Sequence, residues 1–422
     1  MKRILSILSV LVPLLTAGCS QRNHGDEDQS LLLAFRLTYE GKVYNGKISH
    51  EDGVILFDGI TWGRNVEGAA AFLAEGASIS PDPTSYVGDW PAKSVFEVRK
   101  GNVAKEYQVL LPDLFDKEQS GQVVMGYVQP ASWNFDNYFD LIDWNCLTHI
   151  LPSFCYVQAD ASLKTDVLDN YITRIAAAAK ANDVKVVVSV RSTGGESLFS
   201  AAVETPELRE KLAGNIIDYV KKHGLDGVDI DFEEYEKVGS LQQQLYDLFA
   251  RIRSKMDDGM VFSCAVCAGD WVKYGTQWHT YFDYINIMSY DTPRSEQQFS
   301  SYDSYVWDVE YCYEKLDVPY SKLAAGMPFY GRTWEEGIPG TDSAGGITFH
   351  NIMEYYRDID PEAKNLDNIG RTYYNGHATI RRKCEYAKEK GIGGVMIWQL
   401  FQDARRPDES LLKVVGESMF GN

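Results

Sequence analysis

From Gln122 onward the chain alternates short apolar runs with long amphipathic stretches, and this alternation constrains the fold more than any other feature of the sequence. The eight apolar runs read VVMGYV, THILPSFCYV, VKVVVSV, GVDIDF, MVFSCAVCA, YINIMSY, LAAGMPFYG and GGVMIWQL. The stretches between them repeat apolar residues at helical spacing, and one of them, ELREKLAGNIIDYVKKHG, ends at Gly224, a common helix stop. Eight strand–helix units predict an α/β fold, a TIM (β/α)8 barrel, over residues 122–420. The alternative, a doubly wound open sheet, needs a glycine-rich phosphate loop after its first strand, and VVMGYVQPASW has none.

The part of the chain that precedes the predicted barrel has a different sequence pattern. Residues 31–113 contain short strand-like runs separated by turn signals, with helical periodicity only in the alanine-rich patch Gly68–Glu75. The tetrapeptide R-K-G-N between two of the runs predicts a hairpin. This segment is predicted to be a small β-sandwich, and it resembles immunoglobulin-like modules.

The first residues look like a targeting signal rather than part of the fold. Residues 1–19 begin with two basic residues, continue with an apolar run too short to span a bilayer, and end with small residues before Cys19. They resemble a bacterial lipoprotein signal, although Thr16 stands where that motif usually has leucine; an ordinary cleaved signal is the alternative. The resemblance implies lipidation at Cys19 and a flexible tether over residues 20–30. We therefore expect export to the bacterial cell envelope, in the periplasm or on the outer membrane or cell surface, with membrane contact only through the lipid anchor.

Charge and cysteine usage exclude some classes of function. The net charge of −19 argues against nucleic-acid binding, which needs lysine and arginine to displace counterions. Cys264 and Cys267 match C-x-x-C but lie in an expected strand, so we interpret them as buried thiols. The seven histidines show no ligand spacing. We expect neither a metal nor a cofactor.

The fourth apolar run places carboxylates in an unusual setting. Leu225 to Glu234 reads L-D-G-V-D-I-D-F-E-E. Side chains alternate along a strand, so Asp229, Asp231 and Glu233 share one face, which in a barrel points toward the axis. Glu233 comes last, at the C-terminal mouth where barrel enzymes keep their chemistry.

Three interpretations of this row compete. A calcium loop would need oxygen ligands on a turn, with a glycine at the bend and a closing glutamate. An acidic solvent face is hard to place on a central parallel strand. Catalysis is the third, because close carboxylates raise one another's pKa, and a neutral glutamate can act as general acid in glycoside cleavage. Asp226 has the opposite parity and is expected to be structural, whereas Glu234 lies outside the row and is expected to be replaceable.

Five ordered motifs resemble glycoside hydrolase family 18, the chitinase family. D-G-V-D-I-D-F-E is similar to the family's D-x-x-D-x-D-x-E. The others are S-T-G-G at Ser192–Gly195, M-S-Y-D at Met288–Asp291, P-F-Y-G-R at Pro328–Arg332, and Trp398 at the end of the eighth run. The resemblance spans nearly all of residues 122–403.

The resemblance implies cleavage of β-1,4 bonds next to N-acetylglucosamine by a retaining, substrate-assisted mechanism through an oxazolinium intermediate. Glu233 would protonate the leaving oxygen, Asp231 would bind the acetamido N–H, and Asp229 would share a proton with Asp231. Tyr290 would steady the acetamido group. The implied substrate contacts are Met288, Asp291, Tyr330, Arg332, the Trp398 floor, Ser192 as support for the aspartates, and Tyr127 and Phe154 in the pocket wall.

Departures from the family pattern and rival functions remain. Many members follow the acid with Tyr-Pro, and here Glu234 follows it. The short segment Thr333–Lys390 suggests that an inserted α+β module is absent and the cleft is shallow. Trp133, Trp271 and Trp334 are candidates for outer subsites. The substrate is expected to be chitin or a chito-oligosaccharide; alternatives are an endo-β-N-acetylglucosaminidase acting on the chitobiose core of N-glycans, a spore-type cell-wall hydrolase, and a lectin that binds without cutting.

Overall fold

The computed structural model describes residues 31–39, 41–57, 65–86, 88–89, 93–111, 117–192, 197–267, 273–291 and 300–421. The expected signal, Cys19 and the tether lie outside these residues, as do Trp271 and the T-G-G of the S-T-G-G motif. No helix in the described part of the chain is long and apolar enough to cross a membrane.

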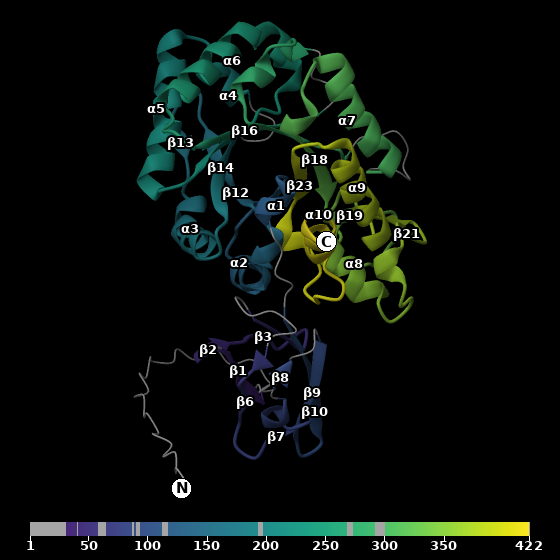
Figure 1. Ribbon diagram of the computed structural model, residues 1–422. Helices are drawn as coiled ribbons and strands as arrows, with labels where there is room; N and C mark the ends of the chain where they lie inside the picture. Colours follow the sequence, from purple (N-terminus) through teal and green to yellow (C-terminus); the bar gives the residue numbers. More distant parts are fainter. Residues whose placement is uncertain are drawn as a thin grey trace.

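The N-terminal unit is a small β domain in which two main sheets enclose one core (Figure 1). Its strands are β1 (Leu32–Tyr39), β2 (Lys42–Asn45), β3 (Lys47–Ser49), β4 (Val54–Leu56), β5 (Asn65–Val66), β6 (Gly68–Leu73), β7 (Ser78–Ser80), β8 (Gly88–Asp89), β9 (Lys93–Lys100) and β10 (Val103–Leu110). The sheets run β2-β1-β6 and β3-β4-β10-β9-β7, with β5 paired to β8. The predicted sandwich is therefore present, and the likeness to immunoglobulin-like modules stays a prediction.

Two local expectations in this domain have opposite outcomes. The R-K-G-N hairpin is confirmed, because β9 and β10 pair Lys100 with Val103 across a turn in which Gly101 takes a φ of 59°. The alanine-rich patch is a strand rather than a helix: β6 pairs with β1, placing Ala69 opposite Leu37. Pairing at the edge of a sheet outweighs the intrinsic helix preference of alanine.

The second unit is the predicted TIM barrel. Its eight strands are β11 (Val123–Val128), β12 (His149–Val157), β14 (Lys185–Ser192), β15 (Gly227–Asp231), β16 (Val261–Val266), β17 (Tyr284–Ile287), β18 (Leu323–Pro328) and β23 (Gly394–Trp398). They pair in parallel in chain order, and β11 closes the barrel by pairing with both β12 and β23. A short strand, β13 (Leu163–Lys164), adds to β12. Because nearly every strand residue is buried, the strands read in the sequence as continuous apolar runs.

Helices surround the barrel, as Figure 1 shows. They are α1 (Lys117–Ser120), α2 (Phe135–Tyr138), α3 (Ile172–Ala181), α4 (Leu198–Ala202), α5 (Pro206–His223), α6 (Tyr235–Lys255), α7 (Tyr302–Leu316), α8 (Phe349–Tyr356), α9 (His377–Lys390) and α10 (Leu411–Phe420). The expected stop at Gly224 is confirmed, since this residue caps α5 with a φ of 61°. Between β16 and β17, the described residues include a 3-10 turn at Trp278–Tyr281.

The expectation that Thr333–Lys390 lacks an inserted module is wrong. Strands β19 (Tyr330–Thr333), β20 (Gly346–Thr348), β21 (Asn368–Ile369) and β22 (Thr372–Tyr373) form an antiparallel sheet in the order β20-β19-β22-β21, with α8 between β20 and β21. The strands are two to four residues long. Runs this short leave no clear period in the sequence. The module stands between the seventh and eighth barrel strands, so the inference of a shallower cleft loses its basis.

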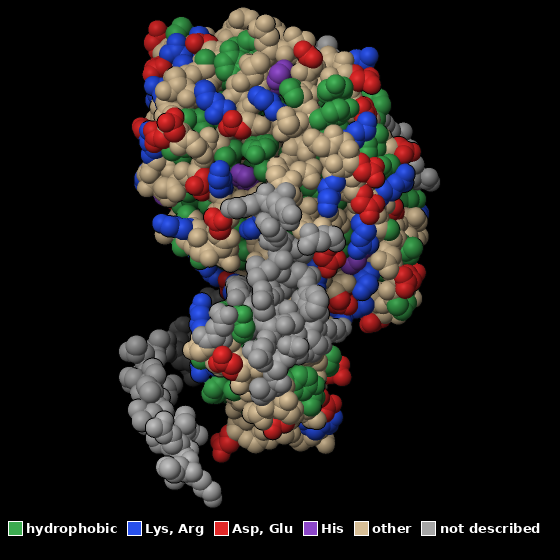
Figure 2. Space-filling model, viewed as in Figure 1, with side chains coloured by type: hydrophobic (Ala, Val, Ile, Leu, Met, Phe, Trp, Pro, Cys, Tyr) green, Lys and Arg blue, Asp and Glu red, His purple; other side chains and the backbone are tan. Residues whose placement is uncertain are grey.

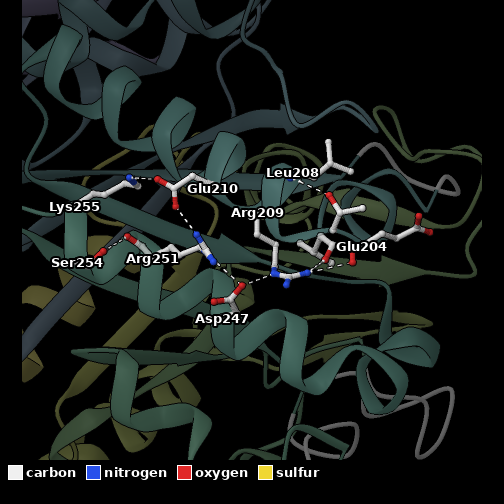
Figure 3. Close-up of polar contacts among 10 residues, drawn as sticks. Glu204, Leu208, Arg209, Glu210, Asp247, Arg251, Ser254 and Lys255 are labelled. Carbon is white, nitrogen blue, oxygen red and sulfur yellow. Dashed lines mark hydrogen bonds and ion pairs between the residues drawn. The ribbon is translucent and has the colours of Figure 1, made fainter.

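A network of ion pairs joins α5 to α6 on the outside of the barrel (Figure 3). Asp247 accepts from Arg209 at 2.6 Å and from Arg251 at 3.0 Å. Glu210 accepts from Arg251 at 2.5 Å and from Lys255 at 2.6 Å. Acidic and basic side chains are likewise interspersed over the face of the molecule drawn in Figure 2, so the negative net charge is not gathered in one block there.

Candidate active site

Strand register brings the polar side chains of the site into layers inside the barrel. Asp229 lies opposite Ser189 of β14 and Ser263 of β16, and Asp231 lies opposite Arg191 of β14, one layer closer to the C-terminal mouth. Because inward positions repeat every second residue, the parity of the carboxylate strand also sets which neighbours can contact it.

Asp229 is held by four donors in the barrel interior. Its Oδ2 accepts from the Tyr127 hydroxyl at 2.9 Å and from Ser189 at 2.8 Å. Its Oδ1 accepts from Ser263 at 2.7 Å and from the Asn286 amide at 3.2 Å. Burial raises the pKa of Asp229, and these hydrogen bonds oppose the rise. Asp229 is fully buried and anchored, so it is not exposed to a ligand in solution.

Asp231 is nearly as buried but much less satisfied. It is 3% exposed, and its Oδ1 has no hydrogen-bond partner. Burial, and then the nearby Glu233 carboxylate, hold the pKa of Asp231 well above its usual range. No hydrogen bond among the described residues joins Asp231 to Asp229, so the shared proton expected between them stays a prediction. A buried carboxyl oxygen without a partner is costly, and a bound ligand could satisfy it.

Glu233 stands two residues beyond β15, at the C-terminal mouth, as the sequence predicts. Its side chain is 28% exposed and pairs with Arg191. Burial raises the pKa of Glu233, whereas the charge and hydrogen bond of Arg191 work against the rise. Glu233 is therefore a partly exposed carboxyl group with a raised pKa, as a general acid requires.

Aromatic rings form one wall of the site. Trp398, at the end of β23, stacks on Phe154 with ring centroids 5.8 Å apart and an interplanar angle of 23°. Tyr127 lies 5.6 Å from Trp398, and the Arg191 guanidinium lies 5.0 Å from the Phe154 ring centroid. Three expected residues thus form a connected surface beside the carboxylates, and flat apolar rings of this kind suit the C–H faces of sugars.

The residues expected after the sixth and seventh strands also come together. The Asp291 carboxylate accepts from the Tyr330 hydroxyl at 2.7 Å and from Arg332 at 2.6 Å. Tyr290 packs edge-on against Tyr330 at 6.2 Å. Burial, and then Asp231, keep the pKa of Tyr290 well above its usual range, so its hydroxyl remains a donor. Met288 belongs to the same interior cluster.

Ser192 is not where the sequence motif suggests. Ser189 binds Asp229 from inside the barrel, and Ser192 has the opposite parity, shared with Val190 in the core between strands and helices. Ser192 makes no hydrogen bond to either aspartate in the described part of the chain. The interpretation that Ser192 supports the aspartates is therefore wrong, and Ser189 takes that place. Strand register with Asp229 could have identified Ser189, Ser263 and Arg191 from the sequence; Asn286 carries no comparable signal.

Glu234 is also different from its expectation. It is 7% exposed and accepts from the backbone N–H groups of Phe199 and Ser200, each at 3.0 Å, and from the Ser200 hydroxyl. It thereby ties the end of the carboxylate strand to the start of α4. Asp226 behaves as expected, since its side chain accepts from the Val186 N–H at 2.8 Å.

The outer aromatic candidates differ in their surroundings. Trp133, in the loop after β11, is 74% exposed. Trp334 packs against Tyr373 of the inserted sheet at 5.7 Å. Among the described residues no hydrogen bond joins either side chain to the site carboxylates, and their part in outer subsites stays a prediction.

The described residues contain no group of three or more histidine, cysteine, aspartate and glutamate side chains that could hold a metal ion. No disulfide links the six cysteines of these residues, and Cys264 is buried whereas Cys267 is partly buried.

Comparisons with known proteins agree with this geometry. A sequence model of the family described as "Glycosyl hydrolases family 18" matches residues 123–403. Chitinase A1 from Niallia circulans is 26% identical over 296 residues, which cover 55% of this chain and 42% of that protein, so the chain spans less than half of that relative. A crystal structure of a chitinase from Bacteroides thetaiotaomicron matches with 38% identity and a TM-score of 0.67, over 71% of this chain and 97% of that one. The chitinase ChiB from the chitin utilization locus of Flavobacterium johnsoniae matches with 28% identity and a TM-score of 0.60, over 71% and 94%.

Proposed function

The chain belongs to glycosyl hydrolase family 18, and from this premise we propose that it is a chitinase, cleaving β-1,4 bonds in polymers of N-acetylglucosamine. The observation that carries the proposal is the position of Glu233, a partly exposed carboxyl group beside the buried Asp231 at the mouth of the barrel. The relatives named as chitinases support the choice of substrate.

The proposed mechanism begins with proton transfer from Glu233 to the glycosidic oxygen. The sugar's 2-acetamido oxygen then attacks C1 as the leaving group departs, which gives an oxazolinium ion and, after hydrolysis, net retention. Intramolecular attack of this kind benefits from high effective molarity. Asp231 is proposed to accept a hydrogen bond from the acetamido N–H and to balance the positive charge.

The environment of the other carboxylates supports a substrate nucleophile. Asp229 is fully buried and bound by four donors, and Asp291 is engaged by Tyr330 and Arg332. A retaining enzyme with its own nucleophile needs a second accessible carboxylate facing the anomeric carbon. Asp229 is not accessible, and Asp291, although 45% exposed, is already bound by Tyr330 and Arg332. The acetamido group is therefore the better candidate.

Glu233→Gln is the decisive variant, because glutamine keeps the shape of the side chain but cannot donate the proton. We expect hydrolysis of chito-oligosaccharides to be lost, with oligosaccharide binding largely retained in calorimetry. Glu236→Gln serves as the matched control, since Glu236 is exposed in the first turn of α6. Cleavage by the Glu233→Gln protein at the wild-type rate would overturn the assignment.

The rival substrate is the chitobiose core of N-glycans, which an endo-β-N-acetylglucosaminidase would cut with the same acid. Product analysis with chitotetraose and a high-mannose glycoprotein separates the two. Chitobiose from the first substrate alone supports a chitinase, and glycan release from the second alone refutes it. Tight binding of both without cleavage would indicate a lectin.

We also propose that the protein is an exported lipoprotein of the bacterial cell envelope, anchored through Cys19. The support is the signal-like sequence ahead of that cysteine. Metabolic labelling with a fatty acid should mark the wild-type protein and not Cys19→Ala. Equal labelling of both proteins would refute the anchor.

A further inference from the structure

Arg191 occupies the same strand layer as Asp231, directly below the proposed acid. It is the penultimate residue of β14 and pairs in register with Asp231 of β15. It shares parity with Ser189, whose hydroxyl reaches Asp229, so its side chain also enters the barrel. The inward layer above Asp229 therefore contains a guanidinium group as well as a carboxyl group.

The contacts of Arg191 connect three parts of the site. Its Nη2 donates to Glu233 Oε2, and its Nη1 lies 3.9 Å from Asp231 Oδ2. Its guanidinium carbon lies 5.0 Å from the centroid of the Phe154 ring, within the range of a cation–π interaction. The Arg191 side chain is 25% exposed, so water screens these contacts only in part.

The other charged groups near Glu233 in the described part of the chain are negative, so its contact with the positively charged Arg191 is important. Asp231 faces it from β15 and Asp291 from the loop after β17, where Asp291 is already paired with Arg332. The phenols of Tyr235 and Tyr290 also face it, and burial keeps both protonated by raising their pKa. Among the residues that the structure describes, Arg191 is thus the cation that Glu233 contacts, and it offsets one of the two negative charges that Asp231 and Glu233 would carry.

We propose that Arg191 is a positioning residue for Glu233: in the free protein its guanidinium holds the Glu233 carboxylate beside Asp231, so that the two acids share one proton rather than holding one each. One proton on the pair and one charge on Arg191 leave the three side chains neutral together. Glu233 then acquires the proton it donates from within the pair. The kinetic part of this inference rests on the proposed function, and the arrangement of charges does not.

The first test is a pH titration of the free protein. Carboxyl-carbon NMR follows the Glu233 signal, which is assigned by its loss in Glu233→Gln. Without the cation both acids keep their protons to higher pH, so Arg191→Gln should raise the Glu233 midpoint by about one pH unit or more. Arg191→Lys keeps the charge without the forked geometry and should fall between the two proteins.

The matched control is Arg174→Gln on α3. Arg174 also pairs with two carboxylates, Asp136 at 2.6 Å and Asp140 at 2.9 Å, and lies 5.1 Å from an aromatic ring centroid. It belongs to the outer surface, so this variant should leave the Glu233 midpoint unchanged.

The second test is the pH dependence of chitotetraose hydrolysis. Both limbs of the kcat/KM profile should move to higher pH in Arg191→Gln and return toward the wild type in Arg191→Lys. Loss of the fixed geometry should lower kcat by about ten- to a hundredfold in both variants with little change in KM. If Arg191→Gln does not fold, the Arg191→Lys protein decides: wild-type kcat and wild-type limbs together would overturn the proposal.

The outcomes separate this inference from the proposed function. A Glu233 midpoint that stays at the wild-type value in Arg191→Gln overturns the role of Arg191, whatever happens to activity. A shifted midpoint in a protein that cleaves neither chitotetraose nor glycoprotein supports Arg191 and refutes the function instead.

Discussion

Glu234 is adjacent to the proposed acid along the chain, yet its side chain supports a different element. Replacing it with alanine removes the acceptor for two backbone N–H groups at the start of α4, Phe199 and Ser200. Unsatisfied buried donors cost about 1–3 kcal/mol each, so we expect Glu234→Ala to lower the free energy of unfolding by about 2–4 kcal/mol. Urea denaturation measures this, with the exposed Glu236→Ala as control. Equal stability of the two variants would contradict the anchoring role.

The two serines of β14 form a matched pair for testing the hydrogen bonds that hold Asp229. Ser189→Ala removes a donor from a buried carboxylate, which costs about 1.5–3 kcal/mol and should lower kcat on chito-oligosaccharides by roughly ten- to a hundredfold if the loss appears in the transition state. Ser192→Ala should leave kcat close to the wild type. Steady-state kinetics on both variants is the measurement, and a larger loss in Ser192→Ala would restore the motif-based assignment.

At this scale the sequence predicts contacts well where alternation along a strand decides them. The inward row of Asp229, Asp231 and Glu233 follows from period-two alternation, and Arg191 and Ser263 follow once the register to Asp229 is known. A motif match does not tell which face of the strand a side chain lies on. For that reason the S-T-G-G motif predicted a role for Ser192 rather than for Ser189. The role of Glu234 depends on how the loop after β15 folds back onto α4, and no local pattern encodes it.

Among the elements, α5 and α6 share a network of ion pairs in which Asp247 and Glu210 are the carboxylates. Asp247 accepts hydrogen bonds from both Arg209 and Arg251. Partial burial would raise its pKa, but these two hydrogen bonds outweigh that effect and hold the pKa below its usual range. A lowered pKa in the folded state adds stability that is present above the unfolded-state pKa and is lost as the pH falls through the folded-state value.

Because the Asp247 side chain is 36% exposed, solvent screens these contacts, and we expect Asp247→Ala to destabilise the protein by only about 1 kcal/mol at neutral pH. The difference should shrink under acid conditions. Asp257→Ala is the control, because Asp257 is 63% exposed and, within the described part of the chain, forms an ion pair with Lys221 alone. Urea denaturation at neutral and acidic pH tests both variants. An equal loss for Asp247→Ala and Asp257→Ala would show that the network adds nothing beyond a surface pair.

Elements were predictable in proportion to their length and burial. The barrel strands are buried on both faces and appear in the sequence as apolar runs. Gly224 correctly predicts where α5 ends. The inserted sheet between β18 and α9 could not be predicted from the sequence, because its strands are only two to four residues long. Pairing with a distant segment, rather than local sequence, stabilises strands of that length.

Across the whole molecule, the sandwich and the barrel have separate hydrophobic cores. A polar contact between them joins Glu51 of the sandwich to Arg405, which follows β23, at 2.5 Å. Leu56 of the sandwich also lines a cavity with barrel residues that include Tyr138 and Leu412. A second cavity is lined by Ile48 of the sandwich and Asp140 of the barrel, among others. An ion pair and these shared cavities make a modest interface, as expected of two domains that can each fold around their own core.

A chain that begins at Lys117 should therefore keep its activity on soluble oligosaccharides. Every side chain assigned to the site comes from the barrel, so we expect kcat/KM on chitotetraose to stay within about twofold of the full chain. The lost ion pair contributes about 1 kcal/mol or less, and the melting temperature of the barrel should fall by only a few degrees. Glu51→Ala in the full chain isolates the contribution of that pair. A large fall in kcat/KM for the shortened chain, with Glu51→Ala unchanged and the barrel still folded by circular dichroism, would mean that the sandwich itself reaches the substrate.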